Sequence, residues 1–188
     1  MLYKPLANDK PCRGLSLSRR PHAALRRKST LHGQMSVKPI PEGFAALTPY
    51  LFARGASRLI EFISAAFEGE LIFQQKRPDG AIMHATMRIG DSMLMLADPT
   101  PEFGPMSTSI YLYVADCDPV YKAALNAGGV SVFPLMTLPS GERYGGIKDP
   151  CGNIWWVATH VEDVPPEEQG RRWKNFQMPP MNRDPSKA

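Results

Sequence analysis

The chain has 188 residues, of which 43% are hydrophobic and 21% are charged, an ordinary composition for a globular protein of one domain. No apolar run approaches the length of about 20 residues that a membrane-spanning helix needs, so no membrane partner is expected. The three cysteines, Cys12, Cys117 and Cys151, show no CxxC spacing. This argues against a disulfide scaffold and a structural zinc site, and predicts a cytoplasmic protein.

The net charge of +4 belongs to the start of the chain. Residues 1–34 contain eight Lys and Arg side chains and one acidic residue, Asp9, so this segment carries a charge of +7. Residues 35–188 therefore carry a net charge of −3. A mildly acidic body gives no reason to expect nucleic acid as a partner. Because residues 1–34 lack an apolar period, we interpret them as a basic, disordered extension. The alternatives are an organellar transit peptide and, preferred here, a natural start at Met35.

From Thr48 onward, two segments of the chain match each other. Residues 48–73, TPYLFARGASRLIEFISAAFEGELIF, resemble residues 109–133, SIYLYVADCDPVYKAALNAGGVSVF. Each copy predicts a short strand, a helix, a glycine stop and a second strand. The apolar stripes expected on the two helices are Leu59, Ile60, Phe62, Ile63, Ala66 and Phe67, and then Val120, Tyr121, Ala124 and Leu125. Asp116 or Asp118 is expected to cap the second helix.

Two further strands follow in each half of the chain. They are predicted at residues 82–89 and 93–97, and again at residues 144–148 and 154–160, the last pair joined by the turn Asp149–Asn153. The pattern is therefore βαβββ twice, an α+β fold. We expect one domain over residues 35–164, then a short helix and tail over residues 165–188, with the ion pairs Glu167–Arg171 and Glu168–Arg172.

The duplicated halves and the closing run RYGGIKDPCGNIWWVATHVED resemble the vicinal oxygen chelate superfamily of glyoxalases, bleomycin resistance proteins and extradiol dioxygenases. The small bacterial glyoxalase-like and PhnB-like members are the most similar. The resemblance covers residues 40–164. It implies a curved, cup-shaped mixed sheet with helices on its convex face, a small ligand inside the cup and a homodimer.

The enzymes of this superfamily place His, Glu or Gln metal ligands at four positions. The resemblance puts these positions at Thr48, near Leu94 to Leu96, at Ser109 and at Trp156. None of these side chains is a good ligand for a divalent ion, and an indole N–H can only donate a hydrogen bond. No cofactor is therefore predicted.

The adjacent Trp155 and Trp156 must point to opposite faces of the last strand, because side chains alternate along a strand. We expect Trp155 to pack under a helix and Trp156 to face the cup. The same alternation, applied to the other strands, gives a predicted ligand-binding set of Tyr50, Phe52, His84, Arg88, Tyr111, Tyr113, Trp156 and His160. Aromatic rings with an arginine suit a planar or anionic ligand. The alternative is a purely structural role, in which both tryptophans are core residues and no ligand binds.

Three functions remain open from the sequence. The first is a metal-independent protein that sequesters or carries a small molecule. The second is a glyoxalase-like lyase or dioxygenase that binds a divalent metal ion through shifted ligands, His84, His160 and Glu142. The third is an interaction protein whose basic residues 1–34 bind nucleic acid or an anionic membrane.

Overall fold

The computed structural model describes residues 37–178, so the predicted extension at residues 1–34 lies outside the described part. The first half contains β1 (Tyr50–Phe52), α1 (Ala56–Phe67), β2 (Glu70–Lys76), β3 (Ile82–Ile89) and β4 (Ser92–Ala97). The second half contains β5 (Ser109–Tyr113), α2 (Cys117–Asn126), β6 (Val130–Thr137), β7 (Glu142–Lys148) and β8 (Ile154–His160). A last helix, α3 (Pro166–Asn175), follows.

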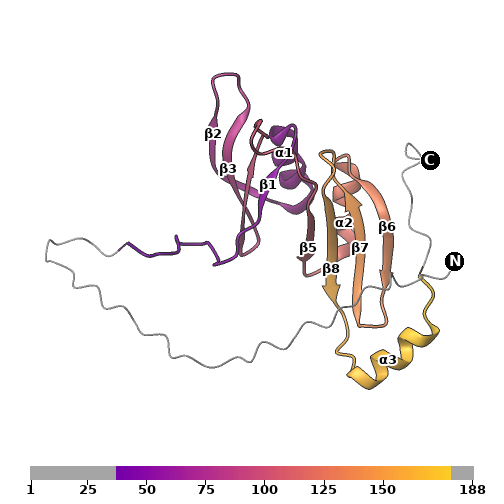
Figure 1. Cartoon of the computed structure of the whole chain (residues 1–188). Helices are drawn as coiled ribbons and strands as arrows, with labels where there is room; N and C mark the ends of the chain where they lie inside the picture. Colours follow the sequence, from indigo (N-terminus) through magenta and orange to yellow (C-terminus); the bar gives the residue numbers. More distant parts are fainter. Residues whose placement is uncertain (1–36, 179–188) are drawn as a thin grey trace, which may run out of the picture. The chain divides into compact units, whose positions relative to one another are not determined.

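The two halves form two four-stranded sheets of the same topology. Their strand orders are β1-β4-β3-β2 and β5-β8-β7-β6, and in each sheet the first strand pairs in parallel with the last while the other pairs are antiparallel. Figure 1 shows β5, β8, β7 and β6 side by side in this order. The predicted α+β fold with a duplicated βαβββ unit is confirmed. Neither sheet closes into a barrel, since β1 and β5 each pair with one strand.

The main core lies between the two helices and the face of each sheet that they cover. Every residue of the apolar stripe predicted for α1 is buried. On α2, Tyr121 and Ala124 are buried and Val120 is partly buried, but Leu125 is 37% exposed, so its predicted place in the core is wrong. Asp116 caps α2 by accepting a hydrogen bond from the backbone N–H of Asp118. The helices thus leave one face of each sheet uncovered, which we call its open face.

The turn between β7 and β8 is organised around one buried carboxylate. Asp149 is 3% exposed and accepts hydrogen bonds from the backbone N–H groups of Cys151 and Asn153, the Asn153 side-chain amide and the Trp155 indole at 2.8–3.0 Å. Multiple donors offset the cost of burying a charged carboxylate. The turn therefore fixes where β8 starts and which face each of its side chains occupies.

Two local expectations are corrected by the structure. Because His84 and Arg88 were predicted on the open face of residues 82–89, alternation puts Met83 against the helices, but Met83 is 44% exposed and Ile82 is fully buried. A register shift lies at this point of the β2–β3 ladder, and such a bulge moves the following side chain to the other face. In α3, Glu168 pairs with both Arg171 and Arg172, whereas the predicted Glu167–Arg171 pair is not formed.

None of the helices between residues 37 and 178 is both long and apolar enough to span a membrane.

Candidate functional site

The open face of the second sheet carries a continuous group of rings, which we call the aromatic face. It consists of Tyr111, Tyr113, Phe133, Tyr144 and Trp156. Adjacent ring centroids are 5.0–6.4 Å apart, and the Tyr144 ring lies within 16° of parallel to Tyr111 and within 25° of parallel to Trp156. Rings at these separations pack against one another and present apolar area.

The register of the second sheet explains this grouping. Tyr111, Trp156 and Gly146 are cross-strand neighbours, and Gly146 pairs with Phe133 on β6. Tyr113 and Tyr144 are both cross-strand partners of Ala158, one from each side. Cross-strand neighbours on one face are in contact distance, so four strands bring their rings to one place.

Trp155 and Trp156 lie on opposite sides of β8, as predicted. Trp155 is 1% exposed and packs on Phe67 of α1 with ring centroids 4.7 Å apart. Trp156 is partly exposed on the aromatic face, and its indole N–H donates to the hydroxyl of Ser109 at 2.9 Å. A built Cβ on Gly146 would lie 2.7 Å from the Trp156 ring. The absence of a side chain at position 146 is therefore what lets this ring lie against the sheet.

The remaining predicted residues of the first sheet form a separate group on its open face. The Tyr50 hydroxyl lies 3.3 Å from Nδ1 of His84, and Nε2 of His84 lies 3.3 Å from the Thr86 hydroxyl. Phe52 stacks on Phe103, with centroids 5.6 Å apart. Among residues 37–178, no ring contact or hydrogen bond joins these side chains to the aromatic face. The predicted ligand-binding residues therefore divide between the two open faces, and Arg88 and His160 contact carboxylates rather than the rings of their own face.

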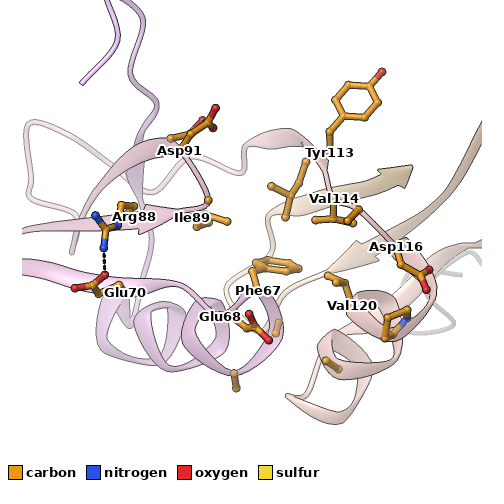
Figure 2. Close-up of a pocket in the computed structure, with 18 of the residues that line it drawn as sticks. Phe67, Glu68, Glu70, Arg88, Ile89, Asp91, Tyr113, Val114, Asp116 and Val120 are labelled. Carbon is orange, nitrogen blue, oxygen red and sulfur yellow. Dashed lines mark hydrogen bonds and ion pairs between the residues drawn. The ribbon is translucent and has the colours of Figure 1, made fainter. Parts of the chain in front are cut away.

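Arg88 faces the open side of the first sheet but is not an isolated cation. Its guanidinium pairs with the carboxylate of Glu70 on the neighbouring strand β2, as Figure 2 shows. A paired arginine attracts an anionic ligand less than a solitary one would, because the ligand must compete with the carboxylate. The electrostatic reason for expecting an anionic ligand is correspondingly reduced.

Acidic and imidazole groups lie at one end of the aromatic face. Glu142 is the cross-strand partner of His160 and accepts a hydrogen bond from the Ser140 hydroxyl. His160 lies 3.8 Å from Glu142 through Nδ1 and 2.9 Å from Asp163 through Nε2. The hydrogen bond with Asp163 raises the pKa of His160 above its usual value. Burial, with further contributions from Tyr113 and Glu142, raises the pKa of the Tyr111 phenol to about 12.

The four positions at which the resemblance places metal ligands do not fit a divalent ion. The register identifies the position that ends the first half as Met95, which neighbours Tyr50 as Trp156 neighbours Tyr111. The donor set would then be two hydroxyls, a thioether and an indole, and the indole already donates to one of the hydroxyls, that of Ser109. Zinc and similar transition-metal ions bind mainly through imidazole, carboxylate or thiolate donors.

The shifted metal ligands are only partly brought together. His160 and Glu142 are neighbours, but His84 lies on the other sheet, and no group of three or more His, Cys, Asp or Glu side chains in residues 37–178 is placed to hold an ion. Metal-dependent chemistry through these residues stays a prediction that metal analysis must test.

A surface cavity of about 1050 Å³ lies beside the aromatic face. It is bordered by the end of α1, the β3–β4 turn, β5 and the start of α2, and Tyr111 and Tyr113 reach it from the aromatic face. Figure 2 shows Phe67 and Ile89 among the residues that line it, together with the carboxylates of Glu68, Asp91 and Asp116. The cavity follows the edge of β5 that pairs with no strand, so one chain leaves this edge uncovered.

Sequence reasoning missed several members of both groups. Phe133 and Tyr144 belong to the aromatic face, and Phe73 and Phe103 contact the group on the first sheet. The sequence repeat could have revealed Phe73 and Phe133, because these two residues occupy matching positions on β2 and β6. Glu142 was considered only as a metal ligand.

Comparison with known proteins assigns the chain to a family. Residues 45–157 match the family model described as the Glyoxalase/Bleomycin resistance protein/Dioxygenase superfamily. This range covers more than half of the chain and includes both βαβββ units. The chain belongs to this superfamily, and the resemblance inferred from the repeat is confirmed.

The chain is also similar to individual proteins and solved structures. An uncharacterized protein of Mycobacterium bovis is 33% identical over 134 residues, which cover 65% of this chain and 88% of the relative. Among solved structures, PA1353 from Pseudomonas aeruginosa is 25% identical with a TM-score of 0.51, covering 62% of this chain and 98% of that one. TioX from Micromonospora sp. ML1 is 22% identical with a TM-score of 0.54, covering 62% and 99%.

TnmS3, an antibiotic binding protein from Streptomyces sp. CB03234, is similar in fold. It is 17% identical, with a TM-score of 0.51, and the match covers 68% of this chain and all of that chain.

Proposed function

We propose that this protein binds a planar aromatic small molecule on the aromatic face and sequesters or carries it without using a metal ion. The observation that carries the proposal is the placement of Trp156. Its ring is partly exposed, lies close against Gly146 and is nearly parallel to Tyr144, at the position where the family resemblance places a metal ligand. A flat apolar surface of this kind supports stacking rather than Lewis-acid chemistry.

The burial pattern of the aromatic face supports the same function. Phe133 and Tyr144 are buried and form its base, whereas Tyr111 is 46% exposed and Tyr113 is 61% exposed. Exposed rings on a buried aromatic base are apolar area that a ligand can still cover. TnmS3, which shares the fold, is an antibiotic binding protein, and binding a small molecule is therefore an activity found on this architecture.

A homodimer completes the proposal. Small-molecule sites enclose most of their ligand, but the aromatic face of one chain is open on one side and β5 has a free edge. A second copy that covers this face can enclose the ligand and bring its own first-sheet group, Tyr50, Phe52, His84 and Arg88, opposite the rings. A twofold interface is also the commonest closed symmetry.

Light scattering tests the assembly, and we expect twice the mass of one chain. Truncation after Val164 removes α3, in which Trp173 is 40% exposed and packs on Phe176. Loss of the dimer would assign the interface to α3, whereas an unchanged dimer would assign it to the sheets. A monomer at every concentration would overturn the homodimer proposal.

Titration of the neutral planar probe anthracene-9-methanol tests the binding site. We expect Trp156→Ala to weaken its binding by about 1–3 kcal/mol, the value of one good aromatic contact and its buried area. Trp173→Ala is the matched control and should leave the affinity unchanged. Equal binding by Trp156→Ala and the unaltered chain would contradict the proposal, as would stoichiometric metal bound to the purified protein in elemental analysis.

A further inference from the structure

We propose that the aromatic face selects planar ligands that carry a positive charge, and that Glu142 holds this charge. The inference rests on the proposed function, because it names the class of ligand for the same face. It replaces the expectation of an anionic ligand, which the sequence suggested from Arg88 alone. Four features of the second sheet support it.

The first feature is the position of Glu142. It lies on β7 two residues before Tyr144 and four before Gly146, so alternation puts all three on the open face. Its side chain is 21% exposed, which limits screening by solvent while leaving the carboxylate accessible. Its charge is also among the causes that raise the pKa of Tyr111, so its field reaches the rings.

The second feature is the sign of the charge at this end of the face. His160 lies between two carboxylates, Glu142 and Asp163. Even when the imidazole is protonated, the two carboxylates outnumber it, and the group of three keeps a net negative charge. Deprotonation of His160 makes this group more negative.

The third feature is the direction in which the nearby cations point. Arg143 follows Glu142 directly, but its guanidinium lies on the other side of β7 and donates two hydrogen bonds to Asp118 of α2. Lys148 shares the open face of β7 but lies six residues from Glu142, about 20 Å along an extended strand. Neither of these two cations therefore lies against the carboxylate of Glu142 on the open face.

The fourth feature is the chemistry of the rings themselves. The face of an aromatic ring carries a partial negative charge and attracts cations. Tyr111, Tyr144 and Trp156 form a connected group of such rings, and Tyr144 lies two residues from Glu142 on β7. The rings and the carboxylate therefore favour the same sign of charge, and an anionic group is opposed by both.

Three probes of similar shape and different charge test the selection on the unaltered full chain at neutral pH and low salt. They are 10-methylacridinium, which is permanently cationic, anthracene-9-methanol, which is neutral, and anthracene-9-carboxylate, which is anionic. Fluorescence titration should rank them in this order, with the cation bound about tenfold more tightly than the neutral probe. Equal affinities, or tighter binding of the anion, would overturn the inference.

Glu142→Gln assigns the selection to one residue. This change removes the charge but keeps an oxygen that can accept from Ser140, and we expect 10-methylacridinium to bind about fivefold to tenfold more weakly. Binding of anthracene-9-methanol should change less than about twofold, because it makes no charged contact. Glu61→Gln is the matched control, since Glu61 is exposed on α1 and the net charge changes equally.

The outcomes separate the inference from the function on which it rests. Charge-independent binding that still depends on Trp156 overturns this inference and leaves the proposed function standing. Failure of all three probes to bind overturns both proposals. If Glu142→Gln does not fold, the ranking of the three probes on the unaltered chain still decides the inference.

Discussion

The two sheets share one topology but present different open faces. In the first, Tyr50 neighbours Met95, and in the second Tyr111 neighbours Trp156, and each residue of the second pair lies 61 positions after its counterpart in the first. The matching positions on the third strands hold Thr86 and Gly146. Duplication has therefore preserved the strand register while the side chains on the open faces have diverged.

This difference shows that packing constrains the helix-covered faces of the sheets more than the open faces. The helix-covered faces supply the shared core, in which Leu51, Leu96, Ile147 and Val157 are fully buried. The open faces contribute less to this core and can differ in chemistry. The first pairs its charges, Arg88 with Glu70, whereas the second combines rings with a net negative end.

The largest expected effect separates the two faces of one strand. Trp155→Ala should lower the free energy of unfolding by about 3–5 kcal/mol, because it removes a buried ring that packs on Phe67 and a donor to Asp149. Trp156→Ala should cost less, since its ring is partly exposed. Urea unfolding followed by circular dichroism measures both. A larger loss of unfolding free energy for Trp156→Ala would mean that the open face of the second sheet contributes more to the core than the helix-covered face does.

A smaller effect is expected at Gly146, which occupies the position held by Thr86 in the first sheet. Gly146→Ala should lower stability by about 1–3 kcal/mol through overpacking, because the new Cβ would meet the Trp156 ring at 2.7 Å and Val132 at 3.0 Å. It should also weaken binding of anthracene-9-methanol by displacing the ring. Thermal unfolding gives the comparison with Gly170→Ala in α3, where a Cβ meets nothing within 4 Å. Equal stability of the two variants would show that the Trp156 ring adjusts freely.

The smallest effect concerns the histidines of the two open faces. His160 contacts carboxylates, whereas His84 contacts the hydroxyls of Tyr50 and Thr86. The folded-state pKa of His160 is raised, chiefly by its hydrogen bond to Asp163. Its stabilising contribution is therefore complete below the unfolded-state pKa of about 6.5 and is lost as pH rises through the higher folded-state value. Comparing His160→Gln with the unaltered chain across this range should show a difference that disappears at alkaline pH.

An NMR titration provides the direct check. The His160 ring signals should titrate above pH of about 6.5, and Asp163→Asn should bring the midpoint down toward the ordinary value. A midpoint that does not move in Asp163→Asn would contradict the assigned cause.

Patterns along the chain predicted much of the fold and part of the candidate site. The stripe of α1, the cap of α2 and the opposite faces of Trp155 and Trp156 follow from helical and strand periodicity. These features need only local backbone geometry, which neighbouring residues determine. Tyr111, Tyr113 and Trp156 could be placed on one face for the same reason.

Other features could not be predicted because they depend on how distant strands align. Met83 and Ile82 exchange faces because of a register shift between β2 and β3, and no periodicity within β3 reveals such a shift. Phe133 joins the aromatic face only because β6 pairs with β7 at Gly146. Its membership depends on a partner strand and not on its own neighbours in sequence.

By itself, the sequence determined the duplicated βαβββ pattern, the α+β class and the opposite faces of Trp155 and Trp156, because these depend on periodicities of two and 3.6 residues. Only the tertiary structure decided which charges meet. It paired Arg88 with Glu70 and put Glu142 beside His160 on the aromatic face. Electrostatic partners are chosen by distance in space, and that distance is set by sheet register between residues far apart in the chain.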